Sequence, residues 1–171
     1  MDALWAREFA GFFWGEGNFM IDIFNRKMRS RRKLADGTLK DYGYRMQYNI
    51  RVRARIIQRE DSRAALDHLI PVLGGHIYVH KSRKMVSGGN GKSYTSNTQL
   101  VWQVQDREQV AHILDLLDQS TFPTLKRREI VVMRQAIEIL RTHNRGWTDE
   151  ELGALKELKA ELSRLRIYTS C

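Results

Sequence analysis

Glu16 is the residue of this sequence whose type and position most clearly suggest chemistry. It stands between Gly15 and Gly17, just after an apolar stretch that is typical of a helix from Ala3 to Trp14. A carboxylate near the C-terminal end of a helix opposes the helix dipole, so a purely structural role explains Glu16 poorly. Carboxylate oxygens are the ligands that hard divalent cations such as Mg²⁺ prefer. We therefore expect Glu16 to be functional.

A second set of chemically informative side chains alternates along residues 47–56. One face of this predicted strand is apolar, and the other carries Gln47, Asn49, Arg51, Arg53 and Arg55. Like charges in such a row repel one another, and a bound polyanion would relieve the repulsion. Guanidinium and amide groups are also the groups that read the edges of bases. The pattern favours a nucleic-acid-binding face; an ordinary solvated sheet face is the alternative.

The overall charge agrees with a polyanion as partner. The 171 residues carry 29 Lys and Arg against 20 Asp and Glu, and the isoelectric point is about 9.9. Between Arg26 and Arg59, twelve basic residues face only two acids. The single cysteine, Cys171, excludes a disulfide framework. No apolar run is long enough to span a membrane, and no secretory signal is recognisable, so we expect an intracellular protein without a membrane partner.

The elements that would position these side chains predict an α+β architecture. After the first helix, we expect strands at 18–26 and 47–56, then a helix at 61–73. A long basic hairpin connection joins the two strands, and an extended ribbon within it is left open. Strands at 76–83 and 99–105 follow, with a turn-rich loop at 87–97, and then helices at 106–117, 126–141 and from 148 onward. We expect one domain, residues 1–171, with a core at about 4–140 and a helical extension at about 147–168. The predicted sheet has four antiparallel strands, with helices on one face and the arginines on the open face.

Three stretches that resemble other functional motifs are better explained as structure. "GGNGKS" at 88–93 lacks the first glycine of a phosphate loop, because Val86 occupies that position. His76 and His80 would lie roughly 13 Å apart on a strand, too far to share one ion. "HNR" at 143–145 lacks the companion histidines of an HNH nuclease.

The stretch Phe9 to Gly17, "FAGFFWGEG", resembles the motif that names the LAGLIDADG homing endonucleases. Ala10, Gly11 and Gly17 match it, whereas Trp14 replaces an Asp and Glu16 replaces the usual metal-binding Asp. The family's αββαββα core agrees with the predicted element order. Because only one copy of the motif is present, the resemblance implies a homodimer. Its expected interface residues are Ala10, Gly11, Trp14 and Gly15.

The resemblance also implies a reaction and the residues that perform it. The expected function is site-specific, double-strand cleavage of DNA at a long palindromic or pseudopalindromic site, with no small-molecule substrate. Glu16 and the backbone carbonyl of Gly15 would hold Mg²⁺ or Mn²⁺, Gln58 would position water, and Lys126 and Arg63 would stabilise the transition-state charge. The expected DNA-binding residues are Asn18, Arg26, Gln47, Asn49, Arg51, Arg53, Arg55, Lys81, Arg83, Gln99 and Gln103.

Two other classes of function stay open at this point. The first is a binding module with the same fold, either an RNA maturase or a DNA-binding regulator that does not cleave. The second is a basic structural or membrane-surface protein, although no cationic amphipathic helix supports it. The acid at position 16 favours the nuclease, because a protein that only binds would not need it.

Overall fold

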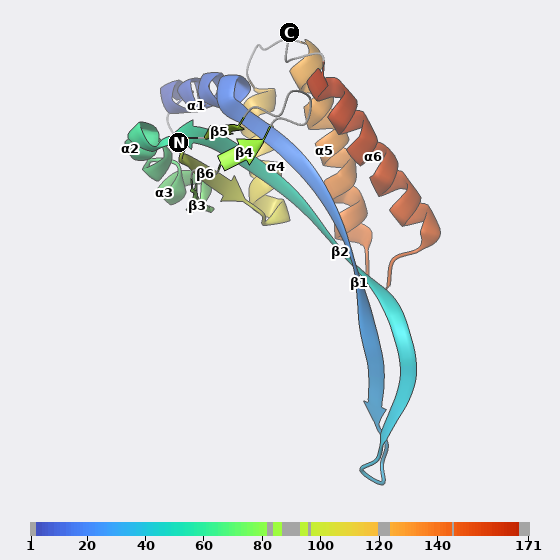
Figure 1. Cartoon of the computed structure of the whole chain (residues 1–171). Coiled ribbons are helices and arrows are strands. Elements are labelled where there is room, and N and C mark those ends of the chain that lie inside the picture. Colours follow the sequence, from blue (N-terminus) through green and yellow to red (C-terminus); the bar gives the residue numbers. More distant parts are fainter. Residues whose placement is uncertain are drawn as a thin grey trace.

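A four-stranded antiparallel sheet with the strand order β1–β2–β6–β3 is the centre of the fold, and helices cover one of its faces (Figure 1). The computed structural model describes residues 3–81, 84–86, 93–95, 97–119, 124–144 and 146–167. Helix α1 (Ala3–Glu16) comes first, and the element order αββαββα predicted from the sequence is confirmed. The α+β prediction is therefore correct.

The first two strands continue into the basic connection and form the extended ribbon that the sequence analysis left open. β1 (Gly17–Lys33) and β2 (Leu39–Arg59) pair along nearly their whole length, so most of the expected basic connection is itself strand. The turn at its tip contains Asp36, whose carboxylate accepts hydrogen bonds from the Thr38 backbone N–H at 2.9 Å and from the Thr38 hydroxyl at 2.6 Å. Figure 1 shows the outer half of this ribbon extending away from the helices.

The predicted helix at 61–73 is divided into three short pieces. A 3₁₀ turn, η1 (Glu60–Ser62), leads into α2 (Arg63–Asp67) and then α3 (Ile70–Leu73). Pro71 has no backbone N–H to continue the first helix, but it is accommodated in the first turn of α3. Gly74 ends the segment with a φ of 71°, a backbone conformation that favours glycine.

The second half of the sheet is short and is interrupted by a small ribbon. β3 (His76–His80) and β6 (Gln99–Val104) pair with each other, and β6 also pairs with β2. Between them, β4 (Lys84–Val86) and β5 (Ser93–Thr95) form a separate two-stranded sheet. β5 lies within the stretch that was predicted to be a loop.

Three helices complete the layer that covers the sheet. α4 (Arg107–Asp118) is N-capped by Asp106 as predicted, and α5 (Thr124–Thr142) follows it. α6 (Asp149–Ile167) begins with the predicted capping box, in which Thr148 and Glu151 exchange backbone and side-chain hydrogen bonds. Within the described part of the chain, no helix has the length and apolar character needed to cross a bilayer.

The hydrophobic core lies between the inner face of the sheet and these helices. Phe9 and Phe13 of α1 form an aromatic chain with Phe19 of β1, with ring centroids 5.7 Å and 4.9 Å apart. Val52, Ala54, Ile56 and Trp102 of the central strands are buried beneath them. Leu155 and Leu162 of α6 belong to the same core, so the C-terminal helix packs as part of the domain.

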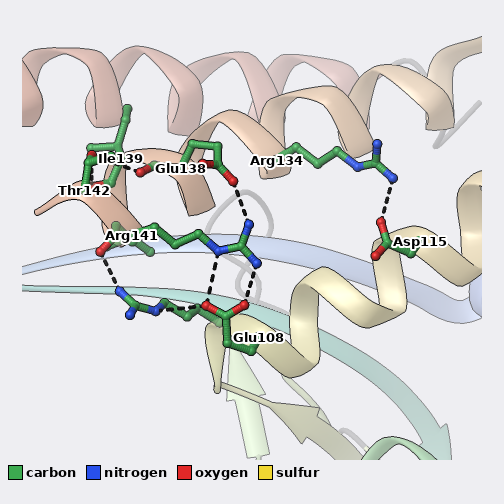
Figure 2. A network of polar contacts seen from close by, with 9 residues as sticks. Glu108, Asp115, Arg134, Glu138, Ile139, Arg141 and Thr142 are labelled. Carbon is green, nitrogen blue, oxygen red and sulfur yellow. Dashed lines mark hydrogen bonds and ion pairs between the residues drawn. The ribbon is translucent and has the colours of Figure 1, made fainter.

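Surface ion pairs join α4 to α5 (Figure 2). Arg141 is paired with Glu108 and Glu138, and Arg134 donates to Asp115 at 2.8 Å. The hydrogen bond from Arg141 lowers the pKa of the Glu108 carboxyl. Because these groups are exposed, each pair contributes little to stability.

The turn between α5 and α6 is attached to the sheet by an aromatic side chain. The indole N–H of Trp147 donates to the Tyr48 carbonyl oxygen at 3.2 Å, and its ring stacks on His143 with centroids 3.5 Å apart. His143 also lies 3.5 Å from the Glu151 carboxylate. The described part of the "HNR" stretch therefore has a structural role.

Gly17 marks the tightest approach between α1 and β1, and it supports a stability prediction. A Cβ atom at this position would lie 2.6 Å from both the carbonyl oxygen and the Cγ atom of Phe13. Gly17→Ala is therefore expected to lower the free energy of unfolding by about 1–3 kcal/mol, which thermal unfolding would measure. Gly153→Ala on α6 is the control, because a Cβ there meets nothing within 4 Å. Equal stability of the two variants would contradict the close approach.

Candidate active site and nucleic-acid interface

Glu16 is the last residue of α1, and its side chain is exposed beside the start of β1. The carbonyl groups in the last turn of a helix, including that of Gly15, have no intrahelical partner. The end of α1 therefore presents one carboxylate together with main-chain oxygens, a donor set that fits a hard divalent cation. Within the described ranges, no group of three or more His, Cys, Asp or Glu side chains is arranged to hold a metal ion.

Gln58 is brought to this end of α1 by the register of the sheet. Gly17 pairs with Ile56, so Gln58, two residues further along β2, lies beyond the start of β1 and alongside the end of α1. It pairs with Leu100 on its other side and is half-buried. The backbone therefore places the Gln58 amide near the Glu16 end of the helix.

Lys126 reaches the same end of α1 from α5. Its ammonium nitrogen lies 6.0 Å from the centre of the Trp14 ring and 3.7 Å from an oxygen of Glu129. Trp14 is two residues before Glu16, so Lys126 lies near the C-terminal end of α1, without a described contact to the Glu16 carboxylate. Burial raises the pKa of Glu129, and the charges of Lys126 and Arg166 oppose this shift.

Arg63 forms an ion pair with an acid of its own helix. Its guanidinium lies 3.3 Å from the Asp67 carboxylate, one turn later on the same helix. Both side chains are about half exposed. A role for Arg63 in the reaction therefore stays a prediction, without a described contact that joins it to Glu16 or Lys126.

The four residues expected at a dimer interface have two different environments. Gly11 and Gly15 are exposed, and a Cβ atom at either would meet nothing within 4 Å. Ala10 and Trp14 are buried in the core of the single chain. A second chain could therefore approach α1 over the glycine face, whereas Ala10 and Trp14 pack inward.

The open face of the sheet contains a polar network that crosses all four strands. Arg53 of β2 forms an ion pair with Asp22 of β1 and donates to the Gln103 amide oxygen of β6 at 2.8 Å. The hydroxyl of Tyr78 on β3 donates to the same oxygen at 3.3 Å. Gln103 is only 2% exposed as a result. The network fixes the orientation of the Arg53 guanidinium at the centre of the face.

The other two arginines of the row also have partners from this chain. Arg55 donates to the Asn18 amide oxygen at 2.7 Å, and Arg51 donates to the amide oxygens of Asn49 and Gln105 at 3.2 Å each. Asp22 and these amide oxygens therefore already reduce the repulsion in the row before any polyanion binds. Asp22 was not among the predicted contact residues.

The remaining predicted contact residues lie toward the rims of the face. Arg26 and Gln47 pair opposite each other on the ribbon, and both are exposed. Gln99, the first residue of β6, is exposed, and so is Lys81, which follows β3 directly. Arg83 lies outside the described residues. Sequence reasoning missed Tyr78 and Gln105. Tyr78 belongs to the face through its hydrogen bond to Gln103, and Gln105 through its hydrogen bond from Arg51.

Comparisons with known proteins find similarity in structure only. No protein-family model and no curated protein sequence matches the chain significantly. The homing endonuclease I-TnaI matches with a TM-score of 0.58 and 18% identity, over 99% of this chain and 97% of that chain. I-LtrWI, a LAGLIDADG homing endonuclease bound to its target DNA, matches with a TM-score of 0.61 and 17% identity. The match covers 93% of this chain but only 43% of I-LtrWI.

A third structure gives the same result. I-CvuI, in complex with an uncleaved DNA target in the presence of Mg, matches with a TM-score of 0.60 and 18% identity over 95% of this chain and 82% of that chain. Because these identities are low, the likeness concerns the fold alone. The coverage of I-TnaI means that the matched region includes α6.

Proposed function

We propose that this chain, which has the fold of the LAGLIDADG homing endonucleases, is a homodimeric, divalent-metal-dependent enzyme that cuts both strands of DNA. The observation that carries the proposal is the exposed Glu16 carboxylate at the end of α1, next to a sheet face that carries three arginines. A long, palindromic or nearly palindromic target is proposed because two identical subunits related by a two-fold axis read the same half-site twice.

The open glycine face of α1 supports the dimer. Gly11 and Gly15 lie four residues apart on one side of the helix, where they allow another backbone to approach closely. Two motif helices that pack on this face would bring two Glu16 carboxylates together at the axis. The lengths of the similar proteins agree with this arrangement. The chain spans nearly all of I-TnaI but less than half of I-LtrWI, which is long enough to contain two such units.

Each residue near the end of α1 has a proposed role. Glu16 and the Gly15 carbonyl would hold Mg²⁺ or Mn²⁺, which when bound neutralises phosphate charge and lowers the pKa of the attacking water. The Gln58 amide orients that water by hydrogen bonding. The Lys126 ammonium, held beside Trp14, stabilises the negative charge that develops on the phosphate. Arg63 remains a weaker candidate for the same task because it is paired with Asp67.

DNA would lie across the open face of the sheet and along the ribbon. Arginine pairs well with guanine, and asparagine or glutamine with adenine, in the major groove. The basic residues of the outer ribbon, such as Arg29 and Arg31, would contact phosphates, which fixes position without reading sequence. Asp41 lies between these two arginines and compensates part of their charge in the free protein.

The network around Arg53 leads to a prediction about sequence recognition. Asp22→Asn removes the charged partner that orients the Arg53 guanidinium. We expect the variant to bind random DNA at least as tightly, because the face becomes more positive, but to discriminate its target from single-base changes about tenfold less well. Binding titrations against the target and a set of point-mutated sites would measure this. An unchanged discrimination ratio would show that Asp22 does not position Arg53 for recognition.

The proposed function is tested by incubating the protein with a library of randomised DNA and Mg²⁺, followed by sequencing of the cut ends. We expect double-strand cuts at one related set of sites, and no cuts when the divalent cation is chelated. Tight, sequence-specific binding without cuts would instead identify a regulator. Preference for an RNA over the selected DNA would identify a maturase.

A further inference from the structure

The side of the ribbon that faces the helices has two neighbouring hollows, and the arginine row lies on the opposite side. Ile23, Asn25 and Tyr48 alternate onto this helix-facing side, whereas Asp22 and Asn49 alternate onto the open face. α6 lies alongside this part of β1, and the turn between α5 and α6 contacts β2 at Tyr48 (Figure 1). Tyr48 lines both hollows, so they adjoin each other.

The first hollow has the size and the lining of a pocket for a flat aromatic ring. Its volume is about 420 Å³, and ligand pockets in proteins measure roughly 300–1,000 Å³. It is lined by Met46, Gln47, Tyr48, His143, Gly146 and Trp147. The Trp147 ring is held in place by its stack on His143 and by its hydrogen bond to the Tyr48 carbonyl oxygen. Nucleobases of any sequence stack on such aromatic rings, and an amide like that of Gln47 can bond to a base edge.

The second hollow is basic and suits a phosphate group. Its volume is about 290 Å³, and it is lined by Ile23, Asn25, Tyr48, Lys156 and Lys159. The two lysines are exposed and lie three residues apart, on one side of α6. Lys27 continues the positive charge along the same side of β1, where it lies 4.8 Å from the centre of the Tyr44 ring. Among the described residues that line the two hollows there is no carboxylate, so a bound phosphate would meet lysines and amides.

We propose that the two hollows form a second nucleic-acid site, which binds a single-stranded segment and leaves the arginine face free for duplex DNA. A base stacks on the Trp147 ring in the first hollow, and the neighbouring phosphates contact Lys156 and Lys159 in the second. An aromatic platform with adjacent cations suits a single strand, because its unstacked bases can enter a pocket, whereas the bases of an intact duplex cannot. The inference goes beyond the proposed function, and it requires neither Glu16 nor a cleavage reaction.

The first test measures the binding of fluorescein-labelled oligodeoxyuridine and oligouridine, each of about ten nucleotides, by fluorescence anisotropy. In the double variant Lys156→Gln with Lys159→Gln, the dissociation constant should rise about tenfold, because two phosphate contacts are lost. The slope of log affinity against log salt should become shallower by about 1.4, since each contact to a single-stranded phosphate contributes about 0.7. The matched control is Arg134→Gln with Arg164→Gln, which removes two charges from the groove between α5 and α6 instead. Equal effects of the two double variants would overturn the proposal.

The second test concerns the aromatic pocket. Trp147→Ala should raise the dissociation constant of the oligomers at least about fivefold, the loss that accompanies removal of one stacked base, and Trp147→Phe should retain most of the affinity. Because Trp147 also packs against the core, the wild-type protein provides an independent readout. An oligomer that contains bromodeoxyuridine is crosslinked by ultraviolet light, and the attached residue is located by mass spectrometry. Crosslinks are expected at Trp147 or His143, and crosslinks found only at other residues would overturn the proposal.

A competition experiment separates this inference from the proposed function. With a mixed-sequence DNA duplex bound stoichiometrically, the oligomers should still bind within about twofold of their affinity for the free protein, because the two sites are independent. Arg51→Gln with Arg55→Gln should weaken duplex binding and leave oligomer binding unchanged. Displacement of the oligomers by the duplex, or loss of oligomer binding in this variant, would place single strands on the arginine face and overturn the second site. Tighter binding of the ribose oligomer would identify RNA as the ligand, and tighter binding of the deoxyribose oligomer would identify single-stranded DNA. These outcomes do not depend on whether the protein cuts DNA.

Discussion

Glu16→Gln is expected to lower the rate of DNA cleavage by at least about a thousandfold. The amide retains the size of the carboxylate but loses the charge that holds a divalent cation at the end of α1. Because such a cation contributes several kcal/mol to transition-state stabilisation, and each 1.36 kcal/mol is tenfold in rate, its loss corresponds to about three orders of magnitude. Single-turnover cleavage of the selected DNA site at saturating protein would measure the effect.

The structure also says what should not change in this variant. Glu16 is exposed, so the thermal unfolding temperature should stay close to that of the wild type. DNA affinity should be retained, because the arginine face lies on the sheet. Glu8→Gln is the matched control, since Glu8 is another exposed glutamate of α1. Cleavage that survives Glu16→Gln, or that is lost equally in Glu8→Gln, would remove Glu16 from the mechanism.

The local sequence was sufficient to predict the elements that position the site. An apolar helix that ends at the Gly15–Gly17 stretch and a strand with strict alternation both follow from short-range periodicity, and the structure contains both. The helix caps at Asp106 and Thr148 were also predictable, because a capping side chain bonds to its own neighbours in sequence. The αββαββα order follows from these local signals.

Features that depend on pairing between distant segments could not be predicted in this way. Asp22 alternates onto the same face as the arginines, but only the β1–β2 register shows that it lies opposite Arg51 and next to Arg53. Gln103 was predicted to be an open contact residue, and it is buried because Arg53 and Tyr78 cover it.

The break in the helix at 61–73 and the length of the ribbon have different physical causes. Pro71 can occupy the first turn of a helix but not its interior, so the chain begins a new helix there. In the ribbon, the basic composition alone leaves the extent of pairing open, and cross-strand contacts stabilise it over nearly the whole length. Asp41 pairs with Arg29, and Lys27 lies 4.8 Å from the ring centre of Tyr44.

Gly11→Leu is expected to abolish double-strand cleavage while leaving the folded monomer intact. Position 11 is exposed and has no neighbour within 4 Å of a Cβ atom, so one chain alone can accommodate a side chain there. A second α1 packed on the glycine face could not, because the added side chain would separate the two backbones. We expect the dimer dissociation constant to rise about 5- to 150-fold, since overpacking a close contact costs about 1–3 kcal/mol. Sedimentation velocity over a range of concentrations would measure it.

A glycine on another helix separates this effect from helix propensity. Gly153 of α6 also has no neighbour within 4 Å of a Cβ atom, and no role in an interface is proposed for it. Alanine is the better helix former by about 1 kcal/mol, so Gly11→Ala and Gly153→Ala should stabilise the monomer similarly. Of these two alanine variants, only Gly11→Ala should weaken the dimer. For Gly11→Leu, a supercoiled plasmid that carries the target should no longer be converted to the linear form. If Gly11→Leu dimerises as tightly as the wild type, α1 is not the contact between subunits, and the two Glu16 carboxylates do not meet at a shared axis.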